Sequence, residues 1–457
     1  MATLAPEKRP IGQLHKVLGL AFALAIGLGS VIGAGIMRTP GAVADVLPAL
    51  DLVLLLWLLG GAHCLLVTNT ASELVTAVPK AGGLYVPVRL AFGESFGLLA
   101  GWVDWLAYVA GMAALAVVSA EFLALLVPAL SDKIALVAAA FGLGSVLLNF
   151  LGVKEGATVQ IAGSLMKFLF VAGLIAVILL SPPLAVAAVG NASAGTAAFA
   201  EPISLFAVVV AYQLIYGAFA GWTAPIYFAE EDVAASKNIP RGLVLSLVTI
   251  TAVYLLVNAS LFHALPLEQL RQSELPVSAA LANIFGPLGG KIVAGGALLL
   301  AASCLNSTVM VVPRILYGMG RDGLFPKIAT RVNKGGTPAV ALGLSAILMI
   351  VLIFSGGFDF LFRLMGALVI LIMVLYQASL FGLRKKYPDI ERPYRAKLYP
   401  YLPALALLLD TALLAAFIAA DWFSGAVLVG LVSISIPIGH HLAKQRAARL
   451  TGSEPTR

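Results

Sequence analysis

The sequence predicts an all-α protein that crosses a membrane many times, and composition, apolar runs and charge distribution each support this. Hydrophobic residues make up 61% of the 457 residues and charged residues only 11%. A soluble globular domain is about 45–50% apolar and about 25% charged. A water-soluble chain of this size could not bury so much apolar surface, so a large part of it must face lipid.

Long apolar runs predict the membrane spans. An apolar stretch of about 18 or more residues can cross the hydrocarbon core as a helix. Twelve stretches qualify: 17–43, 50–77, 96–126, 134–152, 157–181, 203–228, 242–264, 289–318, 338–356, 359–382, 400–420 and 424–443. We expect a single membrane domain over 1–457, with a charged, proline-bearing surface helix and turn at 266–288.

Positive charges are concentrated on one side of this arrangement. Of the 29 lysines and arginines, 22 fall in the loops and tails that share the side of the N-terminus. Lys167 and Arg314 lie within spans, and the five on the other side are Arg38, Lys133, Arg271, Lys291 and Arg363. Cytoplasmic loops carry the excess of lysine and arginine. The sequence therefore predicts cytoplasmic termini in a plasma membrane, and the short tails favour a prokaryotic inner membrane.

The same sequence argues against several other classes of protein. Two cysteines, Cys64 and Cys304, lie in apolar runs and give neither a disulfide framework nor a cysteine zinc site. His63 is the only histidine deep in a span and no catalytic motif surrounds it, so we expect no enzyme. A channel would need a polar pore lining or a filter sequence. We expect no cofactor, no metal and no nucleic-acid partner, while a sensor that binds without transporting stays open.

Two spans carry dense glycine interruptions at corresponding positions of two five-span groups, 17–181 and 203–382. The first span contains GLGSVIGAGIM and the sixth contains YGAFAGW. Unwound backbone inside a membrane persists only where a cavity or ligand satisfies its N–H and C=O groups. Paired interruptions of this kind indicate a transporter binding site near the bilayer midplane. The alternative is that the glycines only allow helices to approach closely.

Five segments together resemble the amino acid–polyamine–organocation superfamily of permeases over nearly the whole chain. They are GSVIGAGI (29–36), ELVTAVPKAGGLYVPVRLAFGESFGLLAGW (73–102), YGAFAGWTAPIYFAEE (216–231), PRILYGMGRDGLFP (313–326) and LRKKYPDIERPYRAKLYPYLP (383–403). The likeness is greatest to sodium-independent amino-acid permeases of the L-type and cationic branches.

This resemblance implies the 5+5 inverted repeat of the leucine-transporter group, with helices one and six unwound and 400–443 appended as two further helices. It also implies a secondary active transporter of an amino acid or related amine. Alternating access would occur around a site between helices one, three, six and eight. A non-transporting sensor and a sodium-coupled symporter of the same fold are the alternatives.

The resemblance also implies where an amino acid binds. Gly33, Ala34 and Gly35 match the family's carboxylate-binding G-x-G, where free N–H groups at a restarting helix carry partial positive charge. The substrate ammonium needs carbonyl acceptors from the unwound segments. We place these acceptors in two groups, the first at Ile26 and Gly27, and the second at Tyr216, Gly217 and Phe219.

Two polar side chains complete the expected substrate site. Ser30 lies in the first break, and Asn306 matches a polar residue of the eighth helix near the substrate in relatives. A hydrogen bond between helices explains Asn306 almost as well.

The sixth span departs from the family pattern. Several members carry a large aromatic residue five positions before the tryptophan that matches Trp222, and here that position is Gly217. Tyr216 or Phe219 could replace that ring as a gate, and its loss should enlarge the pocket for a bulkier substrate. Arg38 is also uncommon, and either attracts an anionic substrate or lies in a watery vestibule.

Lys167 is the most informative charge, because an unpaired cation in the bilayer core costs at least about 2.5–3.5 kcal/mol. By resemblance it matches a lysine that replaces a sodium ion of sodium-coupled relatives. We expect its ammonium to contact carbonyls such as Gly29 or Ser30 and a hydroxyl near Ser303, and to load and release a proton. Proton coupling or exchange would follow. Segment 126–134 lacks the cysteine that would attach a heavy-chain partner, so we expect no obligatory protein partner.

Overall fold

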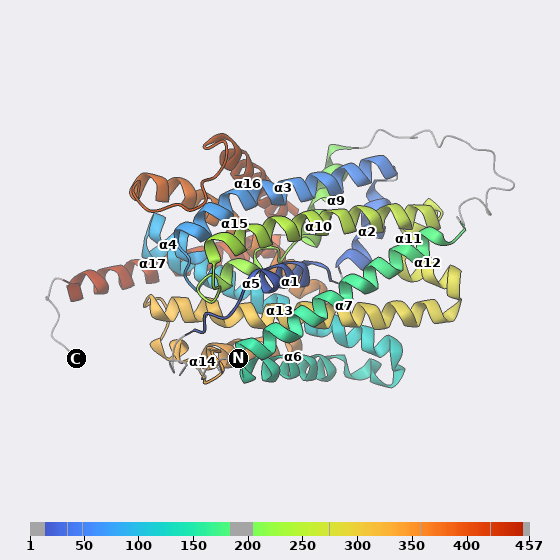
Figure 1. Cartoon of the computed structure of the whole chain (residues 1–457), viewed down its shortest axis with the longest axis horizontal. Coiled ribbons are helices and arrows are strands. Elements are labelled where there is room, and N and C mark those ends of the chain that lie inside the picture. Colours follow the sequence, from blue (N-terminus) through green and yellow to red (C-terminus); the bar gives the residue numbers. More distant parts are fainter. Residues whose placement is uncertain are drawn as a thin grey trace, which may run out of the picture.

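In the computed structural model the chain forms a bundle of long helices (Figure 1). The structure describes residues 14–33, 35–47, 49–182, 204–273, 275–356, 358–420 and 422–450. Within these ranges the regular structure is helical, apart from isolated bridges between Leu18 and Asp232 and between Val332 and Pro338. The predicted all-α membrane class is therefore confirmed.

The helices occur in the expected order along the chain. Their bounds are α1 Leu20–Val31, α2 Gly35–Val46, α3 Leu50–Ala77, α4 Tyr85–Phe92, α5 Glu94–Leu126, η1 Pro128–Lys133, α6 Ile134–Leu151, α7 Val153–Leu180, α9 Leu205–Ala218, η3 Ala224–Phe228, α10 Ala235–Ala264, α11 Leu267–Gln272, α12 Pro276–Phe285, α13 Pro287–Arg321, η4 Lys327–Thr330, α14 Ala339–Ser355, α15 Phe358–Lys386, α16 Tyr401–Ala420 and α17 Trp422–Leu450. The three η elements are 3-10 helices. In Figure 1, α4 lies at one end of the bundle, and α11 and α12 lie at the other.

Most of the expected spans are long enough to cross a membrane. Among the described residues, nine helices qualify by length and apolarity, and there are ten if α1 and α2, which are bent by 45° at their break, count as one span. The other two expected spans are shorter, since α9 has 14 residues and α14 has 17. The count of twelve and the inverted repeat accordingly stay predictions.

Two local elements differ from the sequence-based expectation. The segment expected as one surface helix with a turn forms two short helices, α11 and α12, with Pro276 at the start of the second. Proline suits the first turn of a helix, where its missing N–H would have no partner. The expected loop before α5 contains α4, which ends at Gly93 with a φ of +92°. Glycine tolerates this left-handed backbone, and α5 begins at the next residue.

Helices α5 and α13 form the centre of the bundle. In an apolar stretch of 18 residues from each of these helices, 72% of the residues are buried. The corresponding fraction is 17% for the span that ends in α6 and 33% for α7. α5 and α13 pack against each other, and α15 also packs on α5. Helices buried on most sides hold the interior of a membrane protein, whereas those with exposed apolar faces meet lipid.

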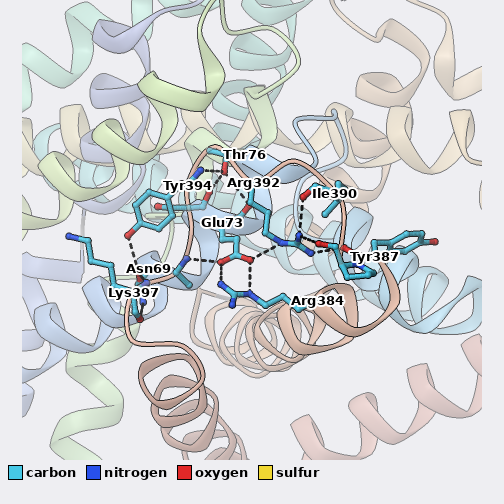
Figure 2. Close-up of polar contacts among 12 residues, drawn as sticks. Asn69, Glu73, Thr76, Arg384, Tyr387, Ile390, Arg392, Tyr394 and Lys397 are labelled. Carbon is cyan, nitrogen blue, oxygen red and sulfur yellow. Dashed lines mark hydrogen bonds and ion pairs between the residues drawn. The ribbon is translucent and has the colours of Figure 1, made fainter.

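The connection between α15 and α16 is held against α3 by several polar contacts, and the Glu73 carboxylate makes most of those with arginine (Figure 2). The Glu73 side chain is 1% exposed and accepts two hydrogen bonds from Arg384, at 2.8 and 2.6 Å. Arg392 Nε lies 3.2 Å from the same carboxylate, and the backbone N–H of Ala396 donates to it at 2.6 Å. A buried carboxylate needs such donors, because burial of an unpaired charge costs several kcal/mol.

We predict that Glu73→Ala destabilises the protein, because it leaves two arginines without their carboxylate. Removal of one partner of a buried ion pair costs about 3–5 kcal/mol, and Arg384 is partly hydrated at 24% exposure. We therefore expect the free energy of unfolding to fall by an amount near the lower end of this range. Thermal unfolding of the detergent-solubilised protein measures it. Glu391→Ala, which removes an exposed carboxylate of the same connection, is the control, and an equal effect of both variants would contradict the role of Glu73.

Candidate functional site

The two predicted helix breaks lie against each other. α1 ends at Val31 and α2 begins at Gly35, while α9 ends at Ala218 and is followed by turns and then η3. Gly221, in these turns, has a φ of +102°, and a Cβ built on it would lie 2.8 Å from the carbonyl oxygen of Ser30. Only glycine accepts both this backbone conformation and this close approach.

Tyr254 of α10 bridges the two breaks. Its hydroxyl lies 3.0 Å from the carbonyl oxygen of Val31 and 2.9 Å from that of Ala218, so its single O–H can donate to a carbonyl at the end of either helix. The ring is fully buried and packs edge-on against Trp57 and Phe219. The sequence analysis missed this residue, although a tyrosine in the middle of an apolar span implies that its hydroxyl has a polar partner.

A cavity of about 330 Å³ lies beside the breaks. This volume is within the range of small-molecule sites. Its walls come from α1, α2, α5, α9, α13 and α15, so α15 joins the four helices that the resemblance implied. The lining residues are Ser30, Val31, Gly33, Gly35, Arg38, Thr39, Ala42, Leu84, Asp104, Ala107, Tyr108, Gly111, Ala114, Leu115, Leu214, Gly217, Ala218, Ala220, Gly221, Thr223, Tyr227, Cys304, Thr308, Met365, Val369, Ile372 and Met373.

Four of the expected substrate residues line this cavity, namely Ser30, Gly33, Gly35 and Gly217. Ala34 lies outside the described residues. The two residues expected to supply carbonyls from α1 lie deeper in the helix, away from the cavity. The Ile26 carbonyl accepts a hydrogen bond from the Ser30 hydroxyl at 2.7 Å. Gly27 faces α10, where a Cβ would lie 2.7 Å from a serine hydroxyl.

The aromatic residues Tyr216 and Phe219 point away from the cavity. The Tyr216 ring lies 5.3 Å from the His63 ring of α3. The Phe219 ring packs between Trp57 and Tyr254. Neither side chain therefore occupies the space that Gly217 leaves.

Asn306 joins helices instead of lining the cavity. Its amide nitrogen donates to Gln160 on α7 at 2.8 Å, and its oxygen accepts from Asn149 on α6 at 2.8 Å. The chain of hydrogen bonds continues from Gln160 through Ser164 to the carbonyl of Ala25 on α1. This network connects α1, the first half of the broken helix, to α6, α7 and α13.

Lys167 is fully buried and points into the first break. Its ammonium donates to the carbonyl oxygens of Gly29 and of Ile32, the latter at 2.9 Å. The α13 group in contact is the Cys304 sulfur at 3.5 Å, one residue beyond the expected Ser303. The Ser303 hydroxyl has no hydrogen-bond partner among the described residues. The ammonium thus satisfies carbonyls that the break leaves without helical N–H partners.

Asp104 is a buried carboxylate in the cavity wall that the sequence analysis did not assign to the site. Both of its oxygens accept from the Tyr227 hydroxyl, at 2.8 and 2.9 Å. The Tyr108 ring packs edge-on against that of Tyr227. An aspartate in the middle of an apolar span is the sequence signal that marks such a position.

One ion pair includes a residue of the cavity wall, Arg38, and another lies beside α4. Arg38 lies 3.5 Å from Glu121 on α5. At the α4 end, Asp322 is 3.0 Å from Arg89 and accepts from the Tyr85 hydroxyl at 3.0 Å. Burial, together with the negative charge of Asp322, raises the pKa of Tyr85 well above its usual value, so Tyr85 stays a neutral donor at physiological pH.

A second group of ion pairs at the α4 end ties η3 to α13. Arg321 donates to Glu230 at 2.7 Å and to the carbonyl of Ala81 at 2.9 Å. Arg314 makes two hydrogen bonds to Glu231, at 2.8 and 2.9 Å, and both side chains are fully buried. These contacts hold the segment after the second break against the central helix α13.

A cavity beside two broken membrane helices is the arrangement of a secondary transporter. A family model described as amino acid permease matches residues 18–437. The chain belongs to this amino acid permease family, and it is accordingly an integral membrane transporter and not an enzyme. This confirms the resemblance drawn from the sequence motifs.

Three relatives illustrate the similarity. The serine/threonine exchanger SteT of Bacillus subtilis (strain 168) is 28% identical over 447 residues, which cover 95% of this chain and 98% of the relative. The cystine/glutamate transporter of Homo sapiens is 28% identical over 87% of this chain and 80% of its own. The branched-chain amino acid permease BcaP of Bacillus subtilis (strain 168) is 28% identical, covering 87% of each chain.

We predict that Gly221→Ala separates the two breaks and destabilises the protein. A side chain at this positive φ costs about 1–3 kcal/mol, and its Cβ would also meet the Ser30 carbonyl. Gly295→Ala on α13 is the control, because a Cβ there meets nothing within 4 Å. Thermal unfolding in detergent should show a lower midpoint for the first variant only. Equal midpoints for the two variants would show that the contact between the breaks is not tight.

Proposed function

We propose that this protein carries a neutral α-amino acid across the plasma membrane by alternating access around the cavity. The observation that carries the proposal is the position of Gly33 and Gly35, which line the cavity where α2 begins. A substrate carboxylate needs such hydrogen-bond donors, and no charged side chain is required to supply them.

Backbone N–H groups supply the proposed carboxylate site. The first four N–H groups of a helix have no carbonyl partner within it, and the helix dipole adds partial positive charge there. Gly33 has no side chain to block this approach, and a Cβ on it would already lie 2.8 Å from the Cys304 sulfur. An anionic group can therefore reach the start of α2 directly.

Carbonyl groups near the end of α9 supply the proposed ammonium site. Lys167 and Tyr254 already satisfy several carbonyls of the first break. The substrate ammonium can instead bind the cavity-lining segment around Gly217 and Ala218. The last carbonyls of a helix have no N–H partner within the helix. The Ser30 hydroxyl faces the same cavity. The ammonium site is thus shifted from α1 towards α9 relative to the sequence-based expectation.

The remaining walls favour an apolar substrate side chain of moderate size. Met365, Ile372 and Met373 of α15 line the cavity opposite the breaks, and Gly111 and Gly217 leave room in its walls. Two of the three relatives, a serine/threonine exchanger and a branched-chain amino acid permease, are named for neutral amino acids, whereas the third is named for cystine and glutamate. Asp104 supports a second candidate, a substrate with an additional amine.

A thermal-shift screen of the purified protein against the common amino acids and polyamines tests this substrate class. A ligand that binds only the native state at about 100 times its Kd adds about 2.7 kcal/mol of stability. We expect the largest shifts from neutral amino acids, and from cationic ones if Asp104 selects an amine. Gly33→Ala should abolish the shift, and Gly343→Ala, where a Cβ meets nothing within 4 Å, should retain it. A screen without any hit would contradict the proposal.

Lys167 supports sodium-independent energetics. Its ammonium occupies the place between α1, α7 and α13 where a cation would balance the carbonyls of Gly29 and Ile32. A bound sodium ion and this ammonium would compete for the same oxygens. We therefore propose a proton symporter or an exchanger. The charge asymmetry of the loops supports cytoplasmic termini, and we propose that the chain works without an obligatory protein partner.

We predict that Lys167→Ala abolishes proton-driven accumulation while the protein still folds. In proteoliposomes with an imposed proton gradient, wild type should concentrate a labelled amino acid and the variant should only equilibrate it. Lys154→Ala, which removes an exposed lysine near the start of the same helix, is the matched control. Accumulation by Lys167→Ala equal to that of wild type would show that this lysine does not couple transport to protons.

A further inference from the structure

A second cluster of ionisable groups is buried on the side of α9 that faces away from the cavity. It consists of His63 on α3 and Asp410 on α16, whose side chains are 2% and 0% exposed and whose Nε2 and Oδ1 atoms lie 3.3 Å apart. Both residues lie near the middle of long apolar helices. An ionisable pair at this depth is costly and marks functional positions in membrane proteins.

The polar groups around the His63–Asp410 pair come from α3, α9 and α15. The Tyr212 hydroxyl lies 2.9 Å from His63 Nδ1, and the Tyr216 ring lies 5.3 Å from the His63 ring. Gln377 of α15 donates its amide N–H to the Asp410 carboxylate. Cys64, next to His63 on α3, is the remaining titratable group that faces Asp410.

Charge balance implies that the pair binds at most one proton. With one proton the pair is neutral overall, as imidazolium with carboxylate or as imidazole with carboxylic acid. A second proton, or the loss of the first, would leave a net charge in an apolar interior, which is costly without compensating partners. The amide of Gln377 stabilises the carboxylate of a pair without its proton, and hydroxyls that α9 turns towards it would do the same, because hydrogen bonds to a charged form favour it.

One helix end contacts both the cavity and the pair. On α9, Leu214 and Gly217 line the cavity, whereas Tyr212 and Tyr216 contact the pair. The α-helix ends at Ala218, so no further helical turn follows this end. Any shift of α9 that changes the cavity therefore also moves the two tyrosines relative to His63 and Asp410.

We propose that the His63–Asp410 pair is a proton-binding site, separate from Lys167, that takes up a proton when α9 withdraws its tyrosines and releases it when they return. When the tyrosines leave, Asp410 loses the neighbouring hydroxyls that stabilise its carboxylate and takes up one proton from the bulk solution as a carboxylic acid. His63 stays a neutral imidazole, so the pair becomes neutral overall. The return of the tyrosines restores the carboxylate beside the neutral imidazole and releases that proton to the solution. This inference rests on the proposed transport function, since α9 moves in the transport cycle.

Infrared difference spectroscopy of the reconstituted protein, recorded as a function of pH, tests proton binding without any substrate. We expect a carboxylic acid C=O band that titrates in wild type and in Lys167→Ala but is missing in Asp410→Asn. Thr411→Val changes the exposed neighbour of Asp410 and should keep the band. Retention of the full band in Asp410→Asn would overturn the proposal, as would an absence of any titrating carboxyl band in wild type.

Transport assays with labelled L-leucine and L-serine give the second readout. A gradient of one pH unit sustains at most about a tenfold accumulation when one proton accompanies each substrate. The reason is that one pH unit and a tenfold concentration ratio correspond to the same free energy. Asp410→Asn and His63→Gln should reduce this ratio to about one while exchange of internal for external amino acid continues. Unchanged proton-driven accumulation in both variants would overturn the coupling role.

Tyr216→Phe guards against a folding defect, because it keeps the ring and the pair but removes a neighbouring hydroxyl. We expect it to fold and to shift the pH at which the infrared band titrates. A purely structural ion pair would lower the thermal stability of Asp410→Asn and leave the titration of Tyr216→Phe unchanged, which contradicts the proposal. If wild type exchanges no amino acid but the band titrates and is lost in Asp410→Asn, the transport function fails while the proton site stands.

Discussion

The structure depends on how the interior satisfies the backbone of two broken helices. A membrane interior offers no water to the N–H and C=O groups that a break exposes. Lys167 and Tyr254 reach these groups from α7 and α10, and the two breaks also pack directly on each other through Gly221. The backbone N–H and C=O groups that these side chains do not satisfy face the cavity. The hydrogen bonds that a ligand can make in the site therefore depend on these groups.

The sequence predicted the scaffold well, because hydropathy and glycine spacing are strong local signals. The expected second span, 50–77, coincides with α3, and both expected breaks occur. α4 was missed because a helix of eight residues is too short to be recognised as a membrane span. α9 is shorter than the expected 203–228, since the backbone after Ala218 turns and continues as η3.

The site was predictable only in part, because side-chain direction depends on tertiary packing. The glycines of the breaks line the cavity as their spacing suggests, but Tyr216, one residue before Gly217, points to the opposite side of α9. Neighbouring positions on a helix are rotated by about 100°, and a sequence does not say which of them faces the cavity. Asp410 escaped notice because its partners come from helices remote in the chain.

The carboxylate of Glu73 has a consequence for motion as well as for stability. It binds α3 to the end of α15 through Arg384, and to the following connection through Arg392 and Ala396 (Figure 2). Two helices joined by a buried, bidentate ion pair resist sliding past each other. We expect α3 and α15 to behave as one rigid wall, so that a change of shape in the cavity must come chiefly from the broken helices that press against this wall.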